Sequence, residues 1–146
     1  MLRKRLLVFA LLAYALPGVA AEPAAAAEEA ATSNWTHTYL KAADGQADAL
    51  RQFIEQNWFA MDAIAVEQGL FKSYVLIENL AEDTREWDFI VAVEYFGDQV
   101  YADIREPFDR IRAAHETVLI DGKGLPELGT IVRSERARYL RGEQNR

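Results

Sequence analysis

Cysteine is absent from the 146 residues of this chain, and histidine occurs only twice, at His37 and His115. The missing cysteines exclude disulfides, thiolate nucleophiles, zinc–thiolate centres and iron–sulfur clusters, so packing must hold the fold together. His37 and His115, with Glu78 or Glu94, could supply ligands for a divalent ion, but none of these residues lie at the short spacings that mark metal sites. We therefore expect neither a metal nor another cofactor.

The sequence also lacks the motifs of covalent catalysis and of phosphate binding. There is no G-x-S-x-G, and Ser33, Ser73 and Ser134 stand at a linker and at strand ends without an adjacent base. The glycines of "DGKGLPELG", Asp121 to Gly129, lack the spacing of a phosphate-binding loop. We expect this segment to be a flexible connection to the last strand.

The N-terminus has no apolar run long enough to cross a bilayer, which needs about 20 residues. Its apolar residues run from Leu6 to Leu16, after the basic cluster Arg3 to Arg5 and before the small residues of "PGVAA". This three-part pattern is typical of a secretory signal peptide at 1–20. No cysteine follows that could carry a lipid, so we expect a periplasmic or secreted protein without a stable membrane anchor.

Basic residues are also scarce. The whole chain carries a formal charge of −7, and without 1–20 it retains 13 Lys and Arg against 23 Asp and Glu, a formal charge of −10. Such a chain repels phosphate backbones and anionic lipid headgroups. We therefore expect no nucleic-acid partner and no membrane-surface partner.

The sequence after the predicted signal peptide predicts one domain at 35–140, between an Ala/Glu-rich linker at 21–34 and a polar tail at 141–146. Within it, periodicity and turn residues predict strands at 35–42, 73–80, 87–96 and 130–140 and helices at 46–69 and 98–115. We expect Asp98 to cap the second helix and Pro107 to kink or restart it.

The β-α-β-β-α-β order predicts an α+β, ferredoxin-like fold, with both helices on one face of a four-stranded antiparallel sheet and the first and third strands in its middle. The third strand contains "FIVAVEYF", which is apolar at nearly every position. A strand with water on one side should alternate apolar and polar residues. We therefore expect a homodimer in which the two sheets stack face to face; the alternative is an unusually hydrophobic strand in a monomer.

This order, the long first helix "ALRQFIEQNWFAMDAIAVEQGLF" and the hairpin "SYVLIENL…WDFIVAVEYF" resemble the dimeric α/β-barrel superfamily over about Trp35 to Tyr139. The resemblance implies dimers paired through their sheets. It also implies a range of activities that includes cofactor-free quinone-forming monooxygenases and polyketide cyclases. Haem-binding branches exist as well, but this chain lacks their extra elements, so we do not expect His115 to bind haem.

The candidate site begins with "NWTHTYLKA", in which Trp35, His37 and Tyr39 share one strand face. An imidazole beside a phenol can shuttle a proton near neutral pH, so His37 and Tyr39 are the candidate catalytic residues. Asn57 and His115 fall inside the apolar stripes of the two helices. If the strand face meets the helices, these residues converge in one cleft.

In that cleft we expect a small apolar or aromatic molecule, bound by Asn57 and His115 between the indoles of Trp35 and Trp58. Cofactor-free acid/base chemistry, of the monooxygenase or cyclase kind, could accompany binding, and the sequence does not decide whether the protein is an enzyme. Structural roles remain open for His37, Asn57 and His115. The alternative function is a non-catalytic periplasmic protein of the same fold, whose cleft is filled by Trp35, Trp58 and Phe108 and whose surface binds a partner.

Overall fold

The computed structural model describes residues 32–81 and 85–140 of the chain. The predicted signal peptide, linker residues 21–31 and the predicted tail at 141–146 lie outside these ranges. The elements in order are β1 (Thr32–Ala42), α2 (Ala47–Phe53), the π-helix η1 (Ile54–Trp58), α3 (Phe59–Glu67), β2 (Ser73–Glu78), β3 (Phe89–Glu94), α4 (Tyr101–Ala114), α5 (Leu125–Leu128) and β4 (Gly129–Leu140). β1 thus begins at Thr32, inside the segment predicted as linker.

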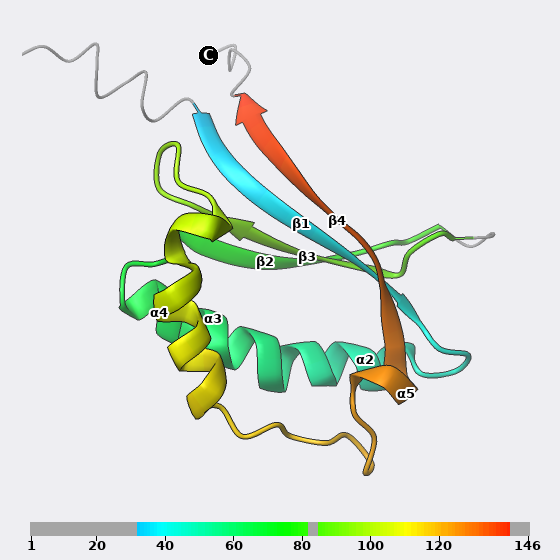
Figure 1. Cartoon of the computed structure of the whole chain (residues 1–146). Helices are drawn as coiled ribbons and strands as arrows, with labels where there is room; N and C mark the ends of the chain where they lie inside the picture. Colours follow the sequence, from blue (N-terminus) through cyan, green and yellow to red (C-terminus); the bar gives the residue numbers. More distant parts are fainter. Residues whose placement is uncertain (1–31, 82–84, 141–146) are drawn as a thin grey trace, which may run out of the picture.

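The strands form one four-stranded antiparallel sheet in the order β2-β3-β1-β4. This confirms an α+β fold with the first and third strands in the middle of the sheet. The helices lie on one face of the sheet, while β1 and β4 extend beyond β2 and β3 as a long two-stranded ribbon (Figure 1). Within residues 32–81 and 85–140, no helix covers the opposite face of the sheet, which we call the open face.

The first predicted helix is continuous, but a π-helical turn divides it into α2, η1 and α3. At this turn the backbone N–H of Phe59 donates to the carbonyl of Ile54, five residues back. The carbonyl of Phe53 accepts instead from the side-chain Nδ2 of Asn57, at 3.0 Å. The extra residue of a π turn changes which side chains face inward, and such turns are frequent at functional sites.

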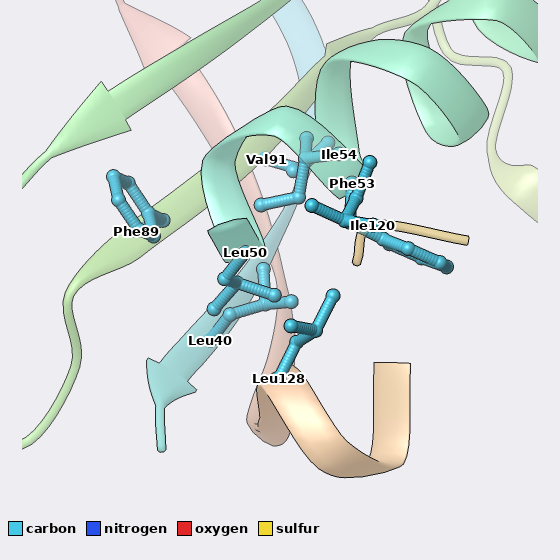
Figure 2. Packing of buried hydrophobic residues seen from close by; sticks show 8 residues of the cluster. All are labelled: Leu40, Leu50, Phe53, Ile54, Phe89, Val91, Ile120 and Leu128. Atoms are coloured by element: carbon cyan, nitrogen blue, oxygen red, sulfur yellow. The ribbon is translucent and has the colours of Figure 1, made fainter. Parts of the chain in front are cut away.

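Two hydrophobic clusters pack the helices against the sheet. The first lies under the central strands and joins Leu40, Leu50, Phe53, Ile54, Phe89, Val91, Ile120 and Leu128 (Figure 2). The second lies between α3, β3 and α4 and comprises Ala65, Phe71, Tyr95, Ile104, Phe108 and Ile111. The cavity described below lies where residues of the second cluster meet the β1–β4 ribbon.

The second helix is not capped by Asp98, as the sequence predicted, and of the two alternatives predicted for Pro107, a kink or a restart, the restart does not occur. α4 runs through Pro107 as a single helix and does not restart there. Its N-terminus is capped by Asp103, whose Oδ2 accepts from the backbone N–H of Val100 at 2.8 Å. Asp98 instead forms an ion pair with Arg138 at 3.0 Å.

The segment predicted as a flexible connection is ordered. It contains the short helix α5, whose Leu128 is fully buried in the first cluster. The next residue, Gly129, starts β4 at a close crossing with β1. A Cβ atom at Gly129 would lie 2.5 Å from the carbonyl oxygen of Lys41. The glycine is required here for close approach between two backbones.

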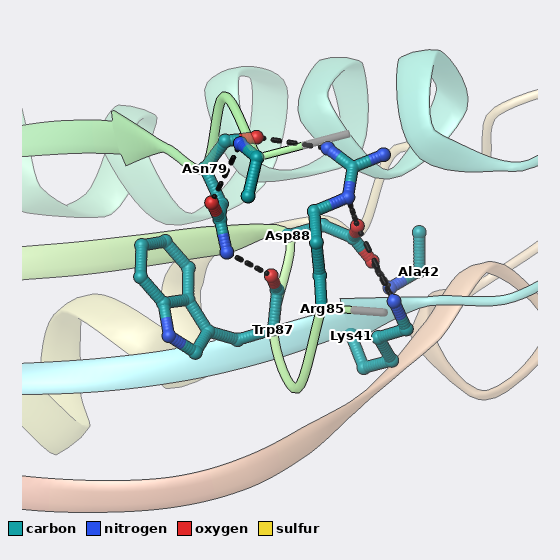
Figure 3. A network of polar contacts seen from close by, with 7 residues as sticks. Lys41, Ala42, Asn79, Arg85, Trp87 and Asp88 are labelled. Carbon is teal, nitrogen blue, oxygen red and sulfur yellow. Dashed lines mark hydrogen bonds and ion pairs between the residues drawn. The ribbon is translucent and has the colours of Figure 1, made fainter. Parts of the chain in front are cut away.

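A polar network fixes the loop between β2 and β3 to the end of β1 (Figure 3). The buried carboxylate of Asp88 accepts from the backbone N–H of Ala42 at 2.8 Å and pairs with Lys41 at 3.3 Å and Arg85 at 3.4 Å. Asn79 Nδ2 donates to the Trp87 carbonyl at 3.0 Å. These contacts join the β2–β3 loop to the end of β1.

Candidate functional site

The two faces of β1 have different surroundings. Leu40 packs in the first cluster with the α2 and η1 side chains, and Thr36 and Thr38 line a cavity on the helix side. Because side chains alternate along a strand, Trp35, His37 and Tyr39 project from the open face. The predicted convergence of this row with Asn57 and His115 is therefore wrong: the sheet separates them.

On the open face, the aromatic residues of β1 and its neighbours pack in tilted and T-shaped pairs. The ring of Tyr139 lies 5.1 Å from that of Trp35 and 5.7 Å from that of His37. Tyr39 lies 5.7 Å from Trp87, and the guanidinium of Arg133 stacks over the Tyr39 ring at 3.8 Å. These side chains form a continuous aromatic row, and Arg133 stacks on one of its rings, that of Tyr39.

His37 lies on the open face beside Tyr139 and Glu135. Its Nε2 lies 3.3 Å from the hydroxyl of Tyr139. Partial burial lowers the pKa of His37, and the nearby carboxylate of Glu135 offsets only part of that effect. The imidazole is consequently mostly neutral near pH 7.

Asn57 and His115 do meet, as the sequence predicted, but in a closed arrangement. His115 Nε2 donates to Asn57 Oδ1 at 3.0 Å, and the same oxygen accepts from the Val118 N–H at 2.7 Å. Asn57 Nδ2 donates to the carbonyls of Phe53 and Val118, each at 3.0 Å. The amide of Asn57 is 2% exposed and has partners at both ends, so it joins η1 to the loop after α4.

A cavity of about 430 Å³, partly open to solvent, lies between the helices and the β1–β4 ribbon. Its wall is mostly apolar and comprises Thr36, Thr38, Trp58, Met61, Asp62, Phe71, Val91, Val93, Tyr95, Tyr101, Phe108, Arg112, Ile131 and Ser134. Trp58 is the one predicted site residue on this wall. The volume of the cavity is in the range of small-molecule sites, which combine apolar walls with a few polar groups.

Asp62 supplies a carboxylate group to the wall of this cavity. Its side chain belongs to α3 and is only 5% exposed. Burial raises its pKa from 3.8 to about 7, and within the described part of the chain no cation offsets that burial. A carboxyl group with a pKa near neutrality can give or take a proton at physiological pH.

The polar groups around Asp62 come from β3 and α4. Tyr95, 2% exposed, follows β3, and burial raises the pKa of its phenol; a hydrogen bond with Thr36 lowers it, while the charges of Asp62 and Tyr101 raise it further. On α4, the guanidinium of Arg112 donates to the Tyr101 hydroxyl at 3.0 Å. Arg112 also pairs with Asp109 at 3.1 Å, so its charge is already balanced.

The sequence reasoning missed Asp62, Tyr95 and Tyr101. Asp62 was identifiable, because it lies four residues after Trp58 and three before Ala65, on the apolar stripe of the first helix. An acidic residue inside such a stripe is as unusual as an asparagine, and Asn57 was predicted as a site residue on that ground. Tyr95 and Tyr101 carried no comparable signal, since both fit their patterns as core residues.

Within 32–81 and 85–140, no three His, Cys, Asp or Glu side chains cluster as they would around a metal ion. Glu94, a candidate ligand, is engaged elsewhere: it accepts from Ser73 Oγ at 2.7 Å and from Lys72 Nζ at 2.9 Å. Over the same residues, none of the helices has the length and apolar character that crossing a bilayer requires.

Comparisons with known proteins give no relative from which to transfer a function. No family model, no curated protein and no solved structure matches the chain.

Proposed function

We propose that the chain binds a small apolar or aromatic molecule in the cavity between sheet and helices. The main observation in support of this proposal is the cavity of about 430 Å³, whose mostly apolar wall surrounds the buried carboxylate of Asp62. Apolar and aromatic walls supply affinity by burying ligand surface, and a polar group fixes orientation. Acid/base chemistry in this cavity would use Asp62, since His37 and Tyr39 face the other side of the sheet.

The alternative of a plugged cleft has less support. It requires Trp35, Trp58 and Phe108 to fill the space between sheet and helices. Trp35 lies on the open face, in contact with Tyr139, and Trp58 and Phe108 stand on the wall of the cavity. Their positions leave space for a ligand.

The test uses Met61, which lines the cavity and is one of only two methionines, the other being Met1. With ¹³C-methyl methionine in the chain, titration with indole should give a saturable shift of the Met61 signal, assigned with Met61→Leu. Ser134→Trp, which fills the cavity from β4, should abolish that shift. Ser134→Ala is the matched control: it also loses the 3.3 Å contact with Thr38 but leaves the cavity open. Unchanged titrations in Ser134→Trp would refute binding in this cavity.

We also propose that the fold is ferredoxin-like and that two copies stack through their open faces, as in the dimeric α/β-barrel superfamily. The strand order and the placement of the helices on one face support the fold assignment. The aromatic row supports the dimer. So does Val75, an apolar side chain that is 42% exposed on β2 and aligned with Ala92 and His37 on the open face.

Light scattering at micromolar concentration should return twice the mass of one chain. Val75→Glu should shift the protein to monomer, because burying an unpaired carboxylate in a stacked-sheet interface costs several kcal/mol. Ile64→Glu replaces an equally exposed apolar residue, 40% exposed, on α3 and should leave the dimer intact. A monomer mass for the unchanged protein would disprove the stacking.

A further inference from the structure

The two charged residues on the cavity wall, Arg112 and Asp62, differ in burial and in whether they have an ion-pair partner. Arg112 has a carboxylate partner, Asp109, at 3.1 Å and remains half-exposed at the rim. Asp62 is 5% exposed, projects into the cavity, and pairs with no cation within the described residues. The cavity therefore presents one net negative site, and that site lies inside it.

The wall around Asp62 is rich in aromatic rings, contributed by Trp58, Phe71, Tyr95, Tyr101 and Phe108. The faces of aromatic rings are partially negative because of the ring quadrupole and attract cations, most strongly where water is excluded. The ring of Phe108 already holds one cation in this way, with the guanidinium of Arg112 5.3 Å from its centroid. A buried carboxylate and several aromatic faces favour the same kind of group, an organic cation with an apolar body.

We propose that the ligand of this cavity is a small primary or secondary amine with an aromatic or aliphatic body, whose ammonium group pairs with Asp62. This assignment rests on the proposed function and adds to it the charge of the ligand. The ammonium supplies the hydrogen-bond donors that the carboxylate lacks. The body of the ligand packs against Met61, Val91 and Val93. The formal charge of the whole chain, −7, favours the approach of cations.

The experiment compares three ligands that share the indole body: tryptamine, a cation, tryptophol, which is neutral, and indole-3-acetate, an anion. Each is titrated into the full chain at pH 8 with the Met61 methyl signal as the reporter. Tryptamine should bind tightest and indole-3-acetate weakest. Asp62→Asn should weaken tryptamine at least about 30-fold, the loss typical of removing one partner of a buried charge pair. It should change tryptophol less than about threefold.

Asp48→Asn is the control for the loss of one negative charge, since Asp48 is exposed and pairs with Arg51 at 3.2 Å. It should leave the tryptamine titration unchanged. If tryptophol or indole-3-acetate binds as tightly as tryptamine, the amine assignment is wrong and cavity binding stands. If none of the indoles shifts the Met61 signal, the proposed function and the amine assignment fail together.

Discussion

Replacing Asp62 with asparagine is expected to raise the free energy of unfolding at pH 8 by about 2 kcal/mol. Burial raises the pKa of Asp62 from 3.8 to about 7, so at pH 8 the folded protein holds a desolvated carboxylate. Ionising it costs about 4 kcal/mol relative to the unfolded chain. Asparagine avoids that cost, although its amide remains buried without a partner, at about 1–3 kcal/mol.

The same pKa sets the pH dependence of the wild-type chain. A carboxyl group whose folded pKa is raised stabilises the fold below its unfolded pKa, and this contribution is lost as pH rises to the folded pKa. For Asp62 the loss spans pH 4 to 7, with no further change above that window. Tyr95, Tyr101 and Arg112 also face the cavity, but tyrosine side chains are ordinarily neutral, and arginine side chains ordinarily charged, throughout this window.

Urea unfolding of the wild type and of Asp62→Asn between pH 4 and 9 measures both effects. The difference between the two proteins isolates Asp62 from the other carboxylates, and Asp48→Asn controls for net charge. We expect the free energy of unfolding of the variant to rise steadily relative to that of the wild type from pH 4 to 7. Above pH 7 the difference should stay constant. A difference that does not vary with pH would mean that the Asp62 carboxylate is solvated.

Asn57→Ala is expected to lower the free energy of unfolding by about 3 kcal/mol. The substitution leaves the buried carbonyl of Phe53 and the partly buried backbone groups of Val118 without their side-chain partner, and an unpaired buried group costs about 1–3 kcal/mol. These bonds hold the loop after α4 against the π turn. Their loss should also expose that loop to amide hydrogen exchange.

His115→Ala is the matched comparison for this effect. It removes only the 3.0 Å contact to Asn57 Oδ1, which keeps the Val118 N–H as a donor, so the expected loss is about 1 kcal/mol. Chemical denaturation of both variants at pH 7 gives the two values. Equal losses, or a loss below 1 kcal/mol for Asn57→Ala, would contradict the role of Asn57 as the tie between helix and loop.

Much of the fold was predictable because it follows from hydrophobic periodicity. The stripes of the two long helices and the two-residue alternation of the strands predicted the four strands, their antiparallel sheet and the central position of β1 and β3. The helix ends were harder to predict. Asp98 and Asp103 are equally good capping residues by type, and only the structure shows which carboxylate meets the Val100 N–H.

The site was harder to predict for a different physical reason. Alternation along "WTHTYLKA" separates two faces but does not say which of them meets the helices. Leu40 decides this, since it packs with Leu50 and Ile54 and thereby directs His37 to the other side. The π turn at Ile54–Trp58 likewise carries a tertiary contact, between Asn57 and Val118, which no local pattern contains.

The last strand has a consequence for aggregation. β4 is a twelve-residue strand at the edge of the sheet, the kind of edge on which another chain can add a strand and begin a fibril. It carries Arg133, Glu135, Arg136 and Arg138 along its length, on both faces of the sheet. An added strand would have to place its side chains beside these charges. We therefore expect the edge to resist fibril growth even at the high concentrations that favour association.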